Sequence, residues 1–379
     1  EAVAAAPAEA LTPAIDASAL LLLATLLDSR AAPPLPILSH DQRRPSGRRG
    51  LSLRLLRAIR EFYREHGGLD KVMGDVCKEA DFAANVCALT RSTGLSLAES
   101  VVHTAESSGA SSAALVGHAT TFFSYSWTGT RLGDMLDAVE GQLERLEASD
   151  GKPRFVWIDM FCASQNLLAG VFEPDAHPRG SAERAARKED TDNIFGDALE
   201  AVGELLLYCS PLSGTWLAPP HPYLDPARGE PPERWERRGP GAITRAWCLF
   251  EMGECLAKGY PLHVVLSPAD VEGFEKLLTE RFDEIAGIVA SIDAREAQIS
   301  KTEDREYILA QVNRVEGGLG GVTKAVCAAL RAWLAREGRA ALARLPAAER
   351  GTSVLINELG RMLQNQGELE EAGELYREA

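Results

Sequence analysis

Short runs of apolar, β-branched and aromatic residues, separated by stretches with helical periodicity, constrain the fold of this chain most strongly. Four such runs cover residues 120–127, 154–161, 205–209 and 261–266. Helical patterns between and after them cover residues 132–146, 194–202, 244–258 and 269–281. Because the runs are continuously apolar instead of alternating, the pattern predicts a parallel sheet covered by helices on both faces. The expected class is α/β, with this domain at residues 111–290.

The segments before the sheet differ from it in composition. Residues 1–50 form an Ala/Pro-rich leader that we expect to be disordered, because its prolines interrupt any continuous helix. The leader ends in four clustered arginines: Arg43, Arg44, Arg48 and Arg49. This cluster is compatible with a nuclear signal or an anion-binding patch, but a solvated linker is the favoured interpretation. Residues 51–110 are expected to form an all-helical subdomain, with Ser96 and Glu99 spaced for a capping box.

Two stretches interrupt the strand–helix alternation. Residues 171–191 and 217–241 are rich in Pro, Gly and charge. They are too long for ordinary connections in an α/β unit, so we expect mobile surface insertions there. After the sheet, residues 291–350 are predicted to be a helical connector. Its apolar stripe consists of Val322, Val326, Leu330, Trp333 and Leu334.

The final segment, 351–379, has the pattern of a tetratricopeptide (TPR) helix pair. Small residues stand where the two helices would cross, at Gly360 and Ala372, and Gly367 stands in the turn. The larger positions beside them are Leu359, Leu363 and Tyr376. A TPR unit has about 34 residues and such arrays need about three units. We therefore expect a truncated first repeat of a longer array in a longer protein.

Composition excludes several classes of function. Lys and Arg total 40 against 55 Asp and Glu, a formal net charge of −15, which argues against binding to nucleic acid or to anionic membranes. The longest apolar run is far shorter than the ~20 residues of a spanning helix. The seven cysteines are scattered without a CxxC pair, which is typical of reduced, buried thiols in a cytoplasmic protein.

Standard catalytic and cofactor motifs are absent. The sequence has no GxxxxGK[ST] phosphate loop, no GxGxxG after a strand, no HExxH and no GxSxG. The seven histidines are dispersed, so no metal site is predicted.

Polar and aromatic side chains follow the first two predicted strands. Ser124, Ser126 and Trp127 end the first strand, and Asp159 ends the second. Open α/β sheets bind ligands outside the carboxyl ends of their strands, so these residues are candidates for a ligand crevice.

A carboxylate and an indole lie four residues apart in the helix at 244–258. Trp247 and Glu251 would share one helix face, and a carboxylate beside an aromatic wall can stabilise an oxocarbenium-like centre or bind ribose hydroxyls. The alternative is that Trp247 and Phe250 are core anchors and that Glu251 is solvated or ion-paired. Spacing alone favours this alternative.

The order of these motifs resembles the Toll/interleukin-1 receptor (TIR) family. The carrying segments are Phe-Phe-Ser-Tyr-Ser at 122–126, Trp-Ile-Asp-Met-Phe at 157–161 and Thr-Arg-Ala-Trp-Cys-Leu-Phe-Glu at 244–251. Residues 75–310 are similar to algal and protist proteins that join a TIR-like domain to TPR repeats of the kinesin-light-chain type. The resemblance implies a flavodoxin-like parallel sheet with flanking helices.

The resemblance also implies a function. We expect an intracellular signalling or adaptor protein whose TIR-like domain self-associates or senses a nucleotide, while TPR repeats bind protein partners. The alternative is an NAD-cleaving glycohydrolase, with NAD as substrate and Glu251 matching the catalytic glutamate of enzymatic TIR domains. Its lining residues would be Ser124, Ser126, Trp127, Asp159 and Trp247. A motor–cargo adaptor ranks last, because no heptad pattern precedes the repeat.

Overall fold

The computed structural model describes residues 16–29, 48–172, 194–212, 215–218, 221–232 and 235–379. A six-stranded sheet lies at the centre of the chain, in the order β2-β1-β4-β3-β5-β8. Its four parallel strands are β3 (Thr121–Ser124), β4 (Phe155–Trp157), β5 (Glu204–Tyr208) and β8 (Leu262–Val265). Each lies within or beside one of the four apolar runs, so the expected α/β class is confirmed.

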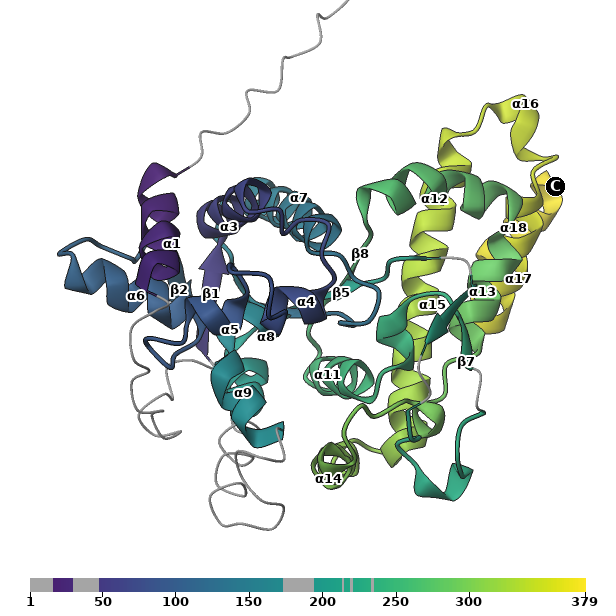
Figure 1. Cartoon of the computed structure of the whole chain (residues 1–379). Helices are drawn as coiled ribbons and strands as arrows, with labels where there is room; N and C mark the ends of the chain where they lie inside the picture. Colours follow the sequence, from purple (N-terminus) through teal and green to yellow (C-terminus); the bar gives the residue numbers. More distant parts are fainter. Residues whose placement is uncertain (1–15, 30–47, 173–193, 213–214, 219–220, 233–234) are drawn as a thin grey trace, which may run out of the picture.

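The parallel strands form the centre of the core. Every residue of β3 and of β5 is buried, and Phe122 lies opposite Leu205 in the register of this pair. The Phe122 ring also stacks on the Trp157 indole of β4, with 4.9 Å between ring centroids. Continuous burial explains why these strands lack polar alternation. Helices α3 (Leu53–Glu65) and α7 (Leu132–Asp150) lie on one side of the sheet and α11 (Ala246–Ala257) lies on the other (Figure 1).

Two strands were not expected. β1 (Arg49–Ser52) pairs antiparallel with β4, and β2 (Val116–His118) pairs antiparallel with β1. The expected boundary between leader and helical subdomain, at residue 51, therefore falls inside a strand. The segment 51–110 is not all helical, because Leu51 and Ser52 belong to the sheet. A Cβ on Gly50 would lie 2.7 Å from the backbone carbonyl of Phe155, so only glycine permits this close approach of β1 to β4.

Five described helices precede β2. They are α1 (Ala17–Ser29), α4 (Met73–Lys78), α5 (Val86–Leu89) and α6 (Leu97–Ser107), together with α3. Two of them, α3 and α6, pack against β1. α1 contacts α3 and α6 through Leu22, Leu23 and Leu26, so this part of the expected disordered leader is an ordered helix. Residues 1–15 and 30–47 of the leader lie outside the described residues. The capping box of Ser96 and Glu99 begins α6, as predicted.

Further helices and 3₁₀ turns follow β4 in the chain. They are α8 (Asp159–Cys162), α9 (Gln165–Phe172), a helix at 194–201, the 3₁₀ turns η2 (Pro226–Arg228) and η3 (Gly241–Thr244), α12 (Pro268–Glu280), α13 (Phe282–Ala290), η4 (Ala294–Glu296), η5 (Thr302–Asp304) and α14 (Arg305–Val312). The expected insertion at 217–241 overlaps a two-stranded sheet of β6 (Thr215–Ala218) and β7 (Trp235–Arg238). Most of the other expected insertion, 171–191, lies outside the described residues.

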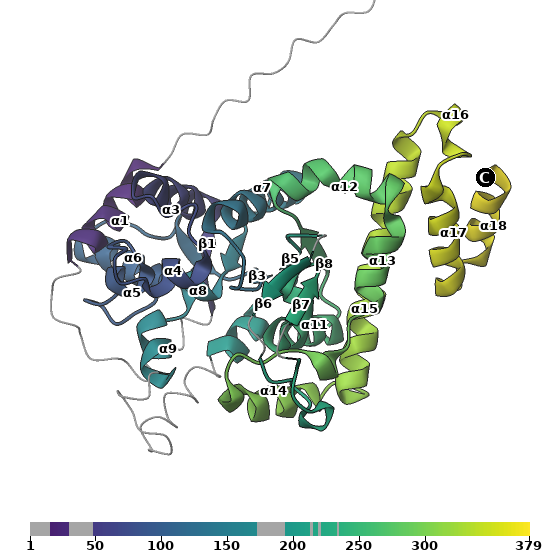
Figure 2. The same cartoon turned by 45° about the vertical axis from the view of Figure 1, so that its right-hand side comes forward.

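The C-terminal part is a stack of helices built on α15 (Gly318–Arg344). All five residues of the predicted apolar stripe of α15 are buried. α16 (Ala347–Arg350) follows, and α17 (Val354–Gln366) and α18 (Leu369–Glu378) then form a helix pair at the end remote from α1 (Figure 2). Gly367 ends α17 with a φ of 87°. A Cβ on Gly360 would lie 2.8 Å from the Tyr376 ring, so the two helices cross closely at that glycine.

Two composition-based expectations can be compared with the structure. All seven cysteines are free thiols and all are buried, as predicted. In the part of the chain that the structure describes, no helix combines the length and the apolar character needed to cross a membrane.

Candidate functional site

The strand order places a switch point beside β3. The chain goes from β3 through α7 to β4 on one side, and then crosses back past β3 to β5 on the other. Connections that leave in opposite directions open a crevice at the carboxyl ends of the strands, where α/β proteins commonly bind ligands. Ser124 ends β3 at this position and residues 125–127 follow it, and the candidate site is built around these four residues.

Asp159 joins the ends of β3 and β4. Its Oδ1 accepts a hydrogen bond from the Tyr125 hydroxyl at 2.6 Å, and its Oδ2 accepts one from the Trp127 indole nitrogen at 2.8 Å. The Met160 amide donates to Oδ1 as well, at 2.6 Å. Burial raises the pKa of Asp159, although these three hydrogen bonds favour its charged form. Both carboxylate oxygens are therefore used within the protein, and they fix the loop after β3.

Glu251 of α11 lies under the end of β3. It is 6% exposed, and its Oε2 accepts a hydrogen bond from the Ser124 hydroxyl at 2.6 Å. Burial raises the pKa of Glu251 to about 8, and the nearby charge of Asp159 acts in the same direction. The carboxyl group is consequently mainly neutral at pH 7. Two residues 127 positions apart in the sequence are thus joined by one buried hydrogen bond.

Trp247 points to a different set of neighbours. Its indole nitrogen donates to Oδ2 of Asp304 at 2.8 Å, just before α14. Its ring packs against Phe195, Phe250 and Tyr307, with centroid separations of 5.1, 6.0 and 5.7 Å. None of these contacts joins Trp247 to Glu251. The arrangement of the indole resembles the core-anchor alternative, in which Trp247 holds α11 against the helix at 194–201 and α14.

Two polar groups near the start of α11 have unused hydrogen-bonding capacity within the described residues. Ser126 is 5% exposed, and its hydroxyl has no hydrogen-bond partner there, while its backbone carbonyl accepts from Thr130 at 2.6 Å. Arg245, just before α11, is half-buried, and its Nη1 also has no partner. Burial lowers the pKa of the Arg245 guanidinium.

A thiol ties α11 to the β3 loop. The Cys248 Sγ donates to the Tyr125 carbonyl at 3.3 Å, and burial raises the pKa of Cys248, so the thiol stays protonated. Sequence reasoning gave no role to Tyr125, Arg245 or Cys248. All three lie within quoted motifs, but the partners of Tyr125 and Cys248 come from other elements and spacing cannot identify them. Among the described residues, no group of three or more His, Cys, Asp or Glu side chains could hold a metal ion.

The structure therefore brings Ser124 together with Glu251, and Trp127 together with Asp159. Two cavities lie elsewhere: one of ≈760 Å³ beside α6, and one of ≈490 Å³ between α13, α15 and α17. Comparison of the chain with family models, with curated proteins and with solved structures found no match.

Proposed function

We propose that this chain is a signalling adaptor, in which a flavodoxin-like, TIR-like α/β domain is joined to a TPR-type helix pair that binds protein partners. The parallel strands support the domain assignment. Across the sheet, the parallel strands lie in the order β4-β3-β5-β8. If they are numbered from one to four along the chain, this order is 2-1-3-4, which is the start of the flavodoxin order. The close crossing at Gly360 supports the repeat assignment, because TPR helices need a small residue at that position.

The observation that carries the proposal is the apolar surface of α17 and α18. The described residues include six exposed large apolar side chains, and Val354, Leu369 and Tyr376 of these two helices are three of them. Leu369 is 65% exposed. Large exposed apolar side chains on one helix pair offer apolar contact area to a partner protein. The helix pair is therefore the part of the chain best suited to contact another protein or a further repeat.

The environment of Glu251 supports assembly in preference to catalysis. A glutamate that stabilises an oxocarbenium-like centre acts as a carboxylate. Here burial holds the pKa near 8, and the Ser124 hydroxyl already occupies Oε2. In this arrangement Glu251 links α11 to β3.

Proximity labelling in cells of the native source tests the binding proposal. The full chain would be compared with the variants Val354→Glu and Leu369→Glu, two exposed positions of the pair, and with Val271→Glu as the matched control. Val271 is also an exposed apolar residue, but it lies on α12. We expect both α17–α18 variants to lose the same set of labelled proteins and the control to keep it. Identical sets from all four proteins would contradict the proposal.

NAD cleavage is the second candidate, and the placement of the predicted residues favours it. Ser124, Asp159 and Glu251 gather at the carboxyl ends of the strands, beside the switch point. Nicotinamide release by the concentrated full chain tests it, with Glu251→Gln and the control Glu254→Gln beside it. Glu254 is half-buried on the same helix and lies 4.0 Å from Lys258. Release that only Glu251→Gln abolishes would establish this activity. Equal rates in all three proteins would exclude Glu251 from it.

A further inference from the structure

Two of the seven free thiols contact each other. Cys77 lies near the end of α4 and Cys87 lies in α5, and their Sγ atoms are 4.0 Å apart. A disulfide needs an S–S distance of about 2.05 Å, so each sulfur would have to move by only about 1 Å to reach it. The two side chains are therefore close to the geometry of a bond that the structure does not contain.

The hydrogen bonds around this thiol pair have a fixed direction. Nε2 of Gln165 donates to the backbone carbonyls of Asp159, at 2.8 Å, and of Ala163, at 3.3 Å. Oε1 of the same amide can only accept, and it accepts from the Cys77 thiol at 3.7 Å. A thiol has one proton, so Cys77 uses its proton here and Cys87 is the donor to the Cys77 sulfur. The donors thus follow one another from Cys87 through Cys77 and Gln165 to the Asp159 carbonyl.

Both cysteines adjoin the start of α9, the helix that follows the Asp159 segment. Gln165 is the first residue of α9, and Asn166 is the second. Nδ2 of Asn166 donates to the Cys87 carbonyl at 3.1 Å. Cys77, Cys87 and Gln165 are at most 9% exposed, so water can replace these hydrogen bonds only in part. A chemical change at the thiol pair is therefore transmitted to the segment that carries Asp159.

We propose that Cys77 and Cys87 form a reversible disulfide, and that its formation loosens residues 159–165. The oxidant is a small-molecule disulfide such as oxidised glutathione. The Cys87 thiolate attacks one sulfur of the oxidant, which forms a mixed disulfide and releases one glutathione thiolate. The Cys77 thiolate then attacks the Cys87 sulfur and displaces the second glutathione. Two protein thiols are oxidised to one disulfide, one glutathione disulfide is reduced to two thiols, and the two protons pass from the cysteines to the released thiolates.

The disulfide acts on the site by removing one hydrogen-bond donor. The proton that Cys77 donates to Gln165 is lost on oxidation, and a disulfide sulfur can only accept. Oε1 of Gln165 then has no donor in a side chain that is 2% exposed, and an unpaired buried acceptor is costly. The amide relieves this cost by rearranging, which weakens its bond to the Asp159 carbonyl.

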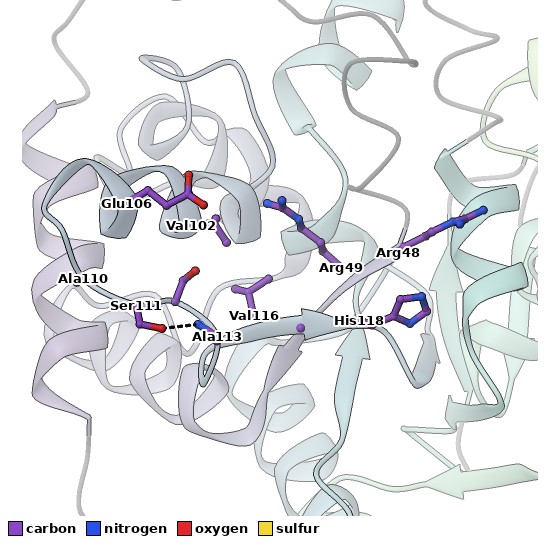
Figure 3. A pocket seen from close by; sticks show the side chains of 11 residues that line it. Arg48, Arg49, Val102, Glu106, Ala110, Ser111, Ala113, Val116 and His118 are labelled. Atoms are coloured by element: carbon purple, nitrogen blue, oxygen red, sulfur yellow. Dashed lines mark hydrogen bonds between the residues drawn. The ribbon is translucent and has the colours of Figure 1, made fainter.

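The pair reacts slowly while α4 and α5 are closed. The hydrogen bond to Cys87 and burial raise the pKa of the Cys77 thiol, so it is protonated at neutral pH. Exchange takes place when these short helices, of six and four residues, open locally. Cys87 is the more exposed thiol, at 9% against 6%, and reacts first. The ≈760 Å³ cavity beside α6 is not the route, because its lining, which includes Arg49, Val102 and Glu106 (Figure 3), contains neither cysteine.

Peptide mapping of the full chain, after equilibration in glutathione buffers, tests the disulfide. Trypsin cleaves after Lys78, between the two cysteines, so the disulfide joins peptides 72–78 and 79–91. We expect these peptides to be linked in an excess of oxidised glutathione and separate in an excess of reduced glutathione. The proposal fails if they remain separate under the oxidising condition. It fails too if they remain linked under the reducing condition, because the bond would then be permanent.

Hydrogen exchange of the same samples tests the effect on the site. Amides of residues 159–165 should exchange about fivefold faster or more in the linked chain, whereas amides of β5 should be unaffected. Cys77→Ser keeps a hydroxyl that can donate to Gln165, so it should show no link and equal exchange in both buffers. Cys209→Ser changes another buried thiol and should respond as the unchanged chain does. Linked peptides with unchanged exchange of residues 159–165 would overturn the proposed effect.

Discussion

The Asp159 carboxylate is the main hydrogen-bond acceptor of the candidate site. It is the acceptor for Tyr125 and for Trp127, two side chains that leave β3 two residues apart. Because both donors are partly buried, the loss of their acceptor costs them hydrogen bonds that water can replace only in part. Asp159 thus orders the loop at the mouth of the site without needing to touch a ligand.

Replacing this carboxylate should destabilise the fold. We expect Asp159→Ala to lower the free energy of unfolding by about 2–4 kcal/mol, since two donors lose their acceptor. Asp159→Asn keeps one carbonyl oxygen and should lose about half as much. Urea unfolding followed by tryptophan fluorescence would measure both variants. A loss below about 0.5 kcal/mol for Asp159→Ala would show that the two hydrogen bonds contribute little.

The sequence could identify the residues of this site but not their partners. Ser124, Asp159 and Glu251 were predicted to lie near one another because each follows or faces a parallel strand end. The family resemblance predicted Trp247 beside Glu251 in a ligand site, whereas spacing alone favoured a core anchor. The indole instead bonds Asp304, a residue 57 positions further on, and no local pattern encodes that contact.

At the scale of elements, the helix pair α17–α18 depends on one close crossing. Gly360 faces the ring of Tyr376, and the Tyr376 hydroxyl donates to Gln364 at 3.3 Å. An ion pair between Arg339 of α15 and Glu371 of α18, with an N–O distance of 2.6 Å, holds the second helix against the long helix α15. The close crossing and the ion pair therefore add to the buried apolar face of α17, which packs against α12, α13 and α15, while the apolar side chains Leu369 and Tyr376 remain exposed.

Two glycines of this pair provide a matched test. Gly360→Ala should destabilise the chain or displace α18, because the new Cβ would lie 2.8 Å from the Tyr376 ring. Gly373→Ala should stabilise α18 by about 0.5–1 kcal/mol, since alanine favours helix and a Cβ there meets nothing within 4 Å. Hydrogen exchange of α18 amides would report both effects. Slower exchange in Gly360→Ala would contradict the crossing described here.

Strands with a continuous apolar sequence could be predicted, whereas strands without one could not. The buried strands β3 and β5 were recognised because a run of four or five buried positions leaves a continuous apolar signature. β1 and β2 have no such signature: the first reads Arg-Gly-Leu-Ser and the second Val-Gly-His. They become strands because β4 offers an open edge, and this is a tertiary effect that propensity does not contain.

At the scale of the whole molecule, β1 joins the N-terminal helices to the α/β sheet. The strand lies between β2 and β4, so the helices around it share their core with the parallel strands. On the other face, α11 connects the sheet to α15 and α14. The buried bond between Ser124 and Glu251 lies where α11 meets the sheet, and our account depends on Glu251 being an internal, neutral group at pH 7.

The pH dependence of stability tests this claim most directly. Burial raises the pKa of Glu251 to about 8 in the folded chain, while 4.5 is the ordinary value that the unfolded chain should have. Between these two values the folded state retains a proton that the unfolded state releases. Folding stability contributed by the neutral carboxyl is therefore complete below pH 4.5 and is lost as the pH rises toward 8. Glu251→Gln cannot titrate, so it should not show this loss.

The measurement is the free energy of unfolding of the unchanged chain and of Glu251→Gln, by urea titration at several pH values between 5 and 8. Contributions from other titrating groups cancel in the difference. We predict that the stability of Glu251→Gln relative to the unchanged chain rises by up to about 1.4 kcal/mol per pH unit. A difference that stays constant over this range would show that Glu251 is ionised in the folded protein and would contradict our account.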